Sequence, residues 1–198
     1  MGLELQYFEG QTPLDEEEKD GLLVKTIATR GDLDEFEQQN IQDAVEWSIS
    51  RNFKLENILQ EQFILNVHKR MLGNVWKWAG TFRKSNKNLG VDKYQIPIEL
   101  RYLLDDCKYW IKQHTYTADE IGIRFKHRLV SIHPFANGNG RHSRLCADIL
   151  IKHGLGKPIF TWGSTNLVTK GTAREKYLEA LREADQGNIL PLIEFARS

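Results

Sequence analysis

Residues 133–144 read HPFANGNGRHSR, and this stretch lies between two segments with helical periodicity. Gly138, Asn139 and Gly140 predict a tight turn that leads directly into a helix. Small residues at this place let several backbone N–H groups point into one concavity, and the helix N-terminus adds the positive end of its dipole. The stretch therefore predicts an anion-binding turn at the start of a helix.

Two arginines and a histidine flank this turn. Arg141 falls in the first turn of the predicted helix, and Arg144 follows three residues later on nearly the same face. Because each guanidinium can grip phosphate oxygens with two donors, the pair predicts a polyphosphate site. His133 can take up a proton near neutral pH, which indicates that it deprotonates a hydroxyl that attacks phosphorus. The alternative, a plain helical corner with solvated arginines, is disfavoured because all these residues occur together in this order.

The surrounding sequence predicts a mainly helical domain. Periodicity and capping residues predict helices over about 32–50, 55–71, 96–114, 117–132 and 140–153, another from 172, and a short last helix over 189–196. Residues 80–95 are polar, contain Gly90 near their middle and favour a short β-hairpin. The expected fold is a helical bundle that carries one small hairpin.

The composition is that of one ordinary globular domain of 198 residues. Lys plus Arg and Asp plus Glu both number 27, and the formal net charge of +0 disfavours direct binding to nucleic acid or to an anionic membrane. No run approaches the roughly 20 apolar residues of a membrane span, and the acidic start lacks a signal-peptide core. Cys107 and Cys146 fall in apolar helical patterns, as buried thiols in a reducing compartment do, so we expect a cytoplasmic protein.

The motif resembles the signature of the Fic family, His-x-Phe-x-acidic-Gly-Asn-Gly-Arg-x-x-Arg. Residues 78–83, WAGTFR, are similar to the family's entry into a flap hairpin, and residues 177–195 are similar to its closing helices. The resemblance implies a Fic-type helical bundle with a small β-hairpin flap. It divides the chain into an N-terminal helical extension over 1–52 and a Fic domain over 53–198. The whole chain resembles a compact single-domain bacterial member, of the branch called mobile mystery protein B.

The resemblance also implies an activity, transfer of AMP from ATP to a Ser, Thr or Tyr hydroxyl of a target protein with release of pyrophosphate. His133 would deprotonate the hydroxyl, and Phe135 would anchor the loop in the core. The turn at residues 138–140 would surround the α- and β-phosphates. Arg141 would hold the β-phosphate and Arg144 the γ-phosphate.

The flap, about residues 84–96, would bind the target by strand addition. An extended target segment would pair with it and place its hydroxyl in line with the phosphorus. Tyr94 and Ile96 are candidates to clamp the target, and the alternative is that they face the core.

The chain departs from the family signature at Asn137, where the family usually has Asp or Glu. That carboxylate helps to hold Mg²⁺. An amide oxygen is a neutral and weaker ligand for this hard cation. The sequence therefore predicts a weakly held Mg²⁺ and leaves the catalytic rate open.

Many family members are restrained by a glutamate from an inhibitory helix, which pairs with the second arginine of the motif. The helix predicted over residues 32–50 offers Glu37 as the first candidate and Glu35 as the second. The family's usual Ser or Thr four positions earlier is absent, because Leu33 and Gly31 stand there. An ordinary solvated acidic face is the alternative.

Two other functions stay open at this stage. The first is transfer of another group, such as phosphate, UMP or phosphocholine, because the family's chemistry varies with the orientation of the nucleotide. Gly140 favours the ordinary orientation, since members that act as kinases have a bulkier residue there. The second is a catalytically weak ATP-binding regulatory module, which Asn137 favours and His133 disfavours. The sequence also leaves open a homodimer and a toxin–antitoxin-like role with a separate antitoxin.

Overall fold

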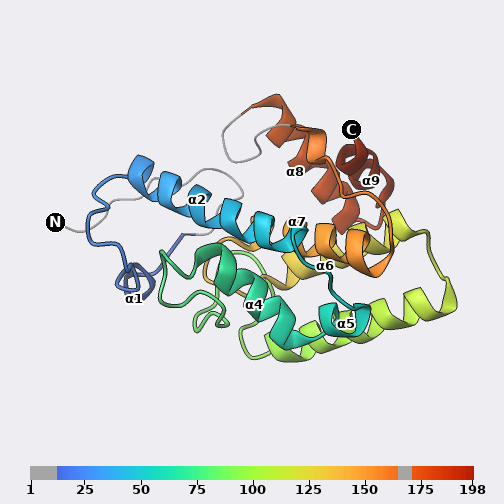
Figure 1. Cartoon of the computed structure of the whole chain (residues 1–198), viewed down its shortest axis with the longest axis horizontal. Coiled ribbons are helices and arrows are strands. Elements are labelled where there is room, and N and C mark those ends of the chain that lie inside the picture. Colours follow the sequence, from blue (N-terminus) through green and yellow to red (C-terminus); the bar gives the residue numbers. More distant parts are fainter. Residues whose placement is uncertain (1–12, 165–170) are drawn as a thin grey trace.

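The structure is a computed structural model that describes residues 13–164 and 171–198. Within these ranges the chain consists mainly of helices, so the predicted fold class is confirmed (Figure 1). The helices are α1 (Glu16–Lys19), α2 (Arg30–Ile49), α3 (Leu55–Ile58), α4 (Glu61–Leu72), α5 (Ile96–Gln113), α6 (Ala118–Ile132), α7 (Asn139–Ile149), α8 (Thr172–Asp185) and α9 (Leu190–Arg197). A π-helical turn, Leu150–Gly154, extends α7, and a 3-10 turn covers Trp162–Ser164. None of the helices in the described part has the length and apolar character to cross a membrane.

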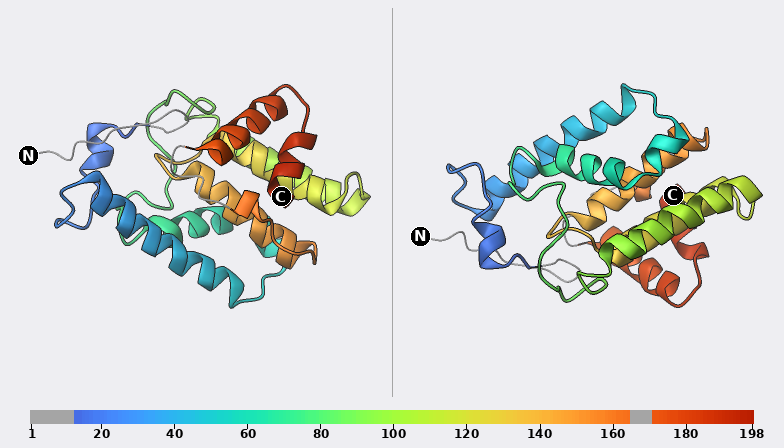
Figure 2. Two further views of the ribbon diagram at one scale, coloured as in Figure 1. Left: turned by 90° about the horizontal axis from the view of Figure 1, so that it is seen from above. Right: turned by 90° about the horizontal axis from the view of Figure 1, so that it is seen from below.

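The helix that starts in the motif, α7, lies in the middle of the bundle. It packs against α6 and α4, while α2 lies on α4 and α5 lies on α6. Both views of Figure 2 place α7 between the α2–α4 pair and the α8–α9 pair. The turn before α7 is therefore held by elements from both halves of the sequence.

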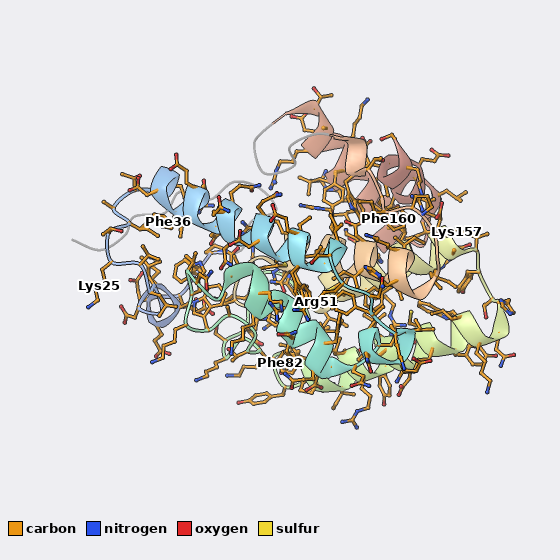
Figure 3. The ribbon with its side chains drawn as sticks, viewed as in Figure 1. Lys25, Phe36, Arg51, Phe82, Lys157 and Phe160 are labelled. Carbon is orange, nitrogen blue, oxygen red and sulfur yellow. The ribbon has the colours of Figure 1, made fainter. Side chains whose placement is uncertain are left out.

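Two hydrophobic clusters fill the space between these helices. The first, built largely from α4, α5 and α6, includes the fully buried Phe125. The second lies under α8 and α9, where Phe160 (labelled in Figure 3) packs in the same cluster as Leu192. Helix α7 contributes Cys146 to the first cluster and Ala147 to the second. Because it is packed on two faces, α7 can hold the turn at its N-terminus in one position.

Capping residues explain where two of these helices begin. Thr29 starts α2 with a capping box, in which the Thr29 side chain accepts from the Asp32 N–H and Asp32 accepts from the Thr29 N–H. The sequence predicted a helix from about residue 32, so α2 begins about two residues earlier than predicted. Thr117 caps α6, close to the predicted start of the helix over residues 117–132, and its hydroxyl accepts from the Glu120 N–H at 3.3 Å.

The helix predicted over residues 55–71 is divided in two. The chain leaves helical geometry at Leu59, with φ −89° and ψ 48°, and Gln60 is extended. Ile58 and Leu59 are both buried, although consecutive residues of a straight helix point about 100° apart. The break therefore turns two neighbouring apolar side chains toward the core.

The β-hairpin predicted over residues 80–95 is not formed, since this segment consists of turns and bends without a strand. Side-chain donors replace the hydrogen bonds of a strand ladder. The guanidinium of Arg83 donates to the carbonyls of Ser85, at 2.8 Å, and Val91. The segment still lies against the turn that contains the motif, because Val91 N donates to the Ile132 carbonyl at 3.3 Å.

The predicted N-terminal extension, residues 1–52, is described from residue 13 onward. Within it, α2 packs along α4 and turns a partly polar face inward. Leu33, Glu37, Asn40, Ala44 and Ser48 are its buried residues. A domain boundary near residue 52 stays a prediction.

Candidate active site

A pocket of about 580 Å³ opens where the motif, α2, α8 and the loop at residues 88–90 meet. Its lining includes every residue that the sequence analysis assigned to the phosphates and the base, namely His133, Gly138, Asn139, Gly140, Arg141 and Arg144. Asn137 also lines it. The structure thus brings the predicted motif residues together around one cavity.

Gly138 lets the chain enter α7 through a sharp turn. It is the N-cap of the helix and has a φ of 79°, a left-handed conformation that glycine adopts without strain. A Cβ atom at this position would lie 2.8 Å from Leu72 Cδ1. At Gly140, by contrast, the nearest side-chain atom to such a Cβ is Arg144 Nη1 at 4.0 Å. The two glycines therefore do different things: Gly138 permits the turn, and Gly140 keeps the start of α7 open toward the pocket.

The side chain of Asn139 closes the turn. Its Oδ1 accepts from the Phe135 N–H at 3.0 Å, and its Nδ2 donates to the Phe135 carbonyl at 2.8 Å, both in a buried position. An amide supplies one acceptor and one donor, which the two backbone groups require. The Asn139 side chain therefore holds the loop, and it is the backbone at this position that can face an anion.

His68 is a second support for the turn, and its role was not predicted from the sequence. Its ring stacks on Phe135 with centroids 3.7 Å apart. Nδ1 accepts from the Gly80 N–H at 2.9 Å, so Nε2 carries the proton and donates to the Asn137 carbonyl at 3.0 Å. Burial lowers the pKa of His68 well below its usual value, which keeps the ring neutral. A lone histidine in a helical segment carries no local signal for this role.

His133 lies at the C-cap of α6 in a left-handed conformation, with φ 55° and ψ 59°. Only 7% of its surface is exposed. Burial, with smaller contributions from the charges of Arg83 and Lys87, lowers the pKa of His133 to about 4. The imidazole is therefore neutral near pH 7 and can accept a proton.

Arg141 is paired with Glu37, the first glutamate candidate. Arg141 Nη1 lies 2.7 Å from Glu37 Oε2, and Glu37 Oε1 accepts from Trp76 Nε1 at 2.7 Å. Glu37 is 4% exposed, so this carboxylate is buried beside the motif rather than on a solvated face. Glu35, the second candidate, is exposed. The contact of Glu37 is with the first arginine of the motif, whereas the family pattern predicted the second, Arg144.

Arg144 lies beside Tyr177 of α8, with its Cζ atom 5.4 Å from the ring centroid. The ammonium group of the fully buried Lys126 lies 4.6 Å from the same centroid. Burial alone would raise the pKa of Tyr177, but the charges of Lys126 and Arg144 outweigh it and lower that pKa. Tyr177 lines the pocket, and Lys126 lies buried beside it outside the pocket lining. No motif in the sequence indicated the contact between these two residues.

Asn137 does not provide a protein-held metal site. Its Oδ1 atom accepts from the Gly138 N–H at 2.5 Å and lies 3.5 Å from Arg141 Nη2. Across residues 13–164 and 171–198, no group of three or more His, Cys, Asp or Glu residues is arranged to hold a metal ion. The side chains at the motif therefore do not fit a divalent cation bound by the protein alone.

The two candidates for clamping a target differ in the structure. Tyr94 is 76% exposed and precedes α5, so it is available to a partner. Ile96 is the first residue of α5 and is fully buried in the core. The core-facing alternative therefore describes Ile96, and of the pair only Tyr94 is placed to contact a target.

Comparison with known proteins agrees with this geometry. Residues 58–151 match the model of the Fic/DOC family. A protein adenylyltransferase Fic from Drosophila virilis is 30% identical over 146 residues, which are 72% of this chain and 28% of that protein. The Aedes aegypti protein of the same name is 29% identical over 136 residues, which are 67% and 26% of the two chains. The chain thus spans little more than a quarter of the length of these relatives.

Solved structures show the same fold. BepC from Bartonella tribocorum, solved with bound AMPPNP, superposes with a TM-score of 0.68 at 17% identity and covers 92% of this chain and 97% of that one. Fic-1 from C. elegans, residues 134–508, superposes with a TM-score of 0.61 at 21% identity and covers 80% and 46% of the two chains. At these identities the likeness establishes the fold.

The buried histidines should make stability depend on pH. Burial lowers the pKa values of His133 and His142 to about 4 in the folded protein, against about 6.5 in the unfolded chain. Between these values the unfolded chain binds the protons and the folded protein does not. Each histidine should therefore lower the free energy of unfolding by about 1.4 kcal/mol per pH unit as the pH falls from 6.5 toward 4.

The measurement is the pH dependence of urea unfolding between pH 4.5 and 7, for the wild type, His133→Gln and His142→Gln. Each variant should take up about one proton fewer on unfolding. Asp148, whose pKa is raised by burial to about 7, titrates in the opposite sense, and the difference between wild type and variant cancels its contribution. Equal slopes in the three proteins would contradict the neutral, buried state of these rings.

Proposed function

Since this chain carries a domain of the Fic/DOC family, we propose that it is a protein adenylyltransferase that transfers AMP from ATP to a Ser, Thr or Tyr hydroxyl of a target protein. The observation that carries the proposal is the pocket, in which a neutral His133 shares one wall with the N-terminus of α7 and two arginines. The named relatives support the same activity.

The proposed reaction is an in-line displacement at the α-phosphorus. The target hydroxyl loses its proton to His133, and its oxygen forms a bond to the α-phosphorus. The bond from that phosphorus to the bridging oxygen of the β-phosphate breaks, and pyrophosphate leaves. Such a transfer needs mainly positioning and neutralisation of phosphate charge, which backbone N–H groups and guanidiniums supply.

The triphosphate would lie along the start of α7, with the backbone of residues 138–140 and the two arginines around it. On the α8 side the pocket is lined by the charged Arg174, Arg182 and Asp185, together with Tyr177, Leu178 and Leu181. Apolar and aromatic side chains of this kind suit the faces of a purine. A cavity of about 580 Å³ falls in the range of small-molecule sites, and we place the adenosine on this side.

The partner is a protein with an accessible hydroxyl, and the setting we propose is the cytoplasm. Cys107 and Cys146 are both buried and unpaired, which suits a reducing compartment. The target segment would approach along residues 88–90, since these residues line the pocket beside His133.

Glu37 is the proposed brake on this activity. Its carboxylate forms an ion pair with Nη1 of Arg141, a donor that a β-phosphate would use. Trp76 donates a hydrogen bond that holds the carboxylate in place. A nucleotide must therefore compete with a buried carboxylate for this arginine. The alternative is that Glu37 orients Arg141 toward the phosphates, and the two roles predict opposite effects of removing its charge.

The activity is tested with ATP labelled on the α-phosphate and, separately, on the γ-phosphate, each incubated with cell lysate. We expect transfer from the α-labelled substrate alone. His133→Ala should reduce it by about 100-fold or more, because a positioned general base contributes at least that factor. His114→Asn changes an exposed histidine at the end of α5 and should leave transfer unchanged. Label from the γ-position alone would indicate a kinase, and binding without transfer would indicate a regulatory module.

Asn137→Asp tests the role of the departure from the family signature. A carboxylate can still accept from the Gly138 N–H, and it adds a charge that attracts a hard cation brought in by the nucleotide. We expect faster transfer and half-maximal activity at a lower Mg²⁺ concentration. An Mg²⁺ titration of α-label transfer measures both, and an identical titration curve for the two proteins would count against this account of Asn137.

Glu37→Gln separates the brake from the orienting role. Glutamine can still accept from Trp76 Nε1 but loses its charge toward Arg141. Hydrogen bonds between charged groups contribute about 1.5–3 kcal/mol, so a brake predicts that ATP affinity and self-modification rise roughly tenfold or more. Glu35→Gln, on the exposed face of α2, is the matched control. A fall in ATP affinity for Glu37→Gln would instead assign the orienting role.

A further inference from the structure

Arg83 is a buried cation that is bonded to backbone carbonyls. It is 5% exposed. Its Nε donates to the His133 carbonyl at 2.7 Å, Nη1 donates to the Ser85 carbonyl at 2.8 Å, and Nη2 donates to the Val91 carbonyl. Within the part of the chain that the structure describes, no carboxylate forms an ion pair with it. The planar guanidinium can reach three carbonyls at once because its donors point in fixed, divergent directions.

One of these carbonyls belongs to His133. The carbonyl groups in the last turn of a helix have no partner within the helix, and the one at the end of α6 is buried. Arg83 satisfies it through Nε, and the Arg83 N–H donates to the Pro134 carbonyl at 2.9 Å. His133 has a left-handed conformation, which costs about 1–2 kcal/mol for a residue with a Cβ atom. The two bonds from Arg83 oppose relaxation of this conformation, which sets the direction of the imidazole.

The other two carbonyls belong to the loop that lies on His133. Gly90 approaches so closely that a Cβ atom on it would be 2.5 Å from His133 Cβ and 3.0 Å from Arg83 Nη2. The Arg83 guanidinium bonds the loop on both sides of this contact, at Ser85 and at Val91. The Arg83 side chain therefore connects the backbone of His133 to the loop that borders the pocket.

From this geometry we propose that Arg83 is a positioning residue, which fixes the imidazole of His133 and the loop at residues 85–91 relative to each other. Arg83 itself does not line the pocket, so it acts through His133 and the loop rather than on the nucleotide. The expected effect on catalysis, through the alignment of a hydroxyl, a base and a phosphorus, rests on the proposed function. Its structural part, the state of His133, can be measured without any transfer.

The test uses the full chain with Arg83→Gln, Arg83→Lys and a control, Arg101→Gln, which changes an exposed arginine on α5. ATP affinity is measured by calorimetry, transfer with α-labelled ATP, and the titration of His133 by NMR of its ring resonances. A misplacement of about 1 Å at a reacting centre costs on the order of 100-fold in rate. We therefore expect transfer to fall about 100-fold in Arg83→Gln, with ATP affinity within threefold of the wild type.

Two further results are specific to positioning. The pKa of His133 should rise from about 4 in Arg83→Gln, because the loop that buries the ring is released and a nearby positive charge is removed. Arg83→Lys keeps the charge but cannot reach three carbonyls, so it should restore the fold without restoring the rate. If Arg83→Gln does not fold, Arg83→Lys should show the same result, a lower rate of transfer with ATP affinity nearly unchanged.

Several outcomes would overturn the proposal. Transfer within threefold of the wild type in both variants would do so, as would an unchanged His133 titration. An equal loss of ATP affinity and of transfer would assign Arg83 to nucleotide binding instead. If the wild type itself transfers no label, the proposed function fails, while the His133 titration in Arg83→Gln still decides whether Arg83 positions this ring.

Discussion

The turn that joins α6 to α7 depends on a pair of buried hydrogen bonds between one amide side chain, Asn139, and the backbone of Phe135. These groups are shielded from water, so a bond left unmade there would cost about 1–3 kcal/mol. His68 stacks on Phe135 and ties the Asn137 carbonyl to the Gly80 N–H, which removes the remaining freedom of the loop. These contacts together hold the turn in the geometry that places the N-terminus of α7 at the pocket.

Neutral histidines and positively charged residues occupy different places around this turn. The histidines nearest to it, His68 and His142, are neutral because burial lowers their pKa values. Positive charge lies on the wall of the pocket, where Arg141 and Arg144 line the cavity, and on the buried Lys126, 4.6 Å from the Tyr177 ring centroid. Cations gathered in a cavity repel one another, and an anion bound among them relieves that repulsion. The arginines on the pocket wall therefore favour an anionic ligand.

The sequence was most informative where one local feature decides the structure. Thr117 caps α6 and Gly138 turns the chain into α7, and both effects act within a few residues. It was least informative where a side chain bonds distant backbone. The hairpin prediction was wrong because Arg83 supplies hydrogen bonds that a pattern of alternating residues cannot reveal. His68 and Glu37 likewise owe their positions to the packing of α2 and α4, so the sequence did not show that Glu37 meets Arg141.

The partly polar inner face of α2 links the position of this helix to Arg141 in the pocket. Glu37 and Asn40 are buried in the middle of this face, and each has partners outside α2: Trp76 and Arg141 for Glu37, and the Arg70 carbonyl for Asn40. Separating two polar surfaces exposes less apolar area to water than separating two apolar surfaces. Water can then replace many of the hydrogen bonds that are broken. The packing of α2 on α4 therefore fixes where the Glu37 carboxylate meets Arg141.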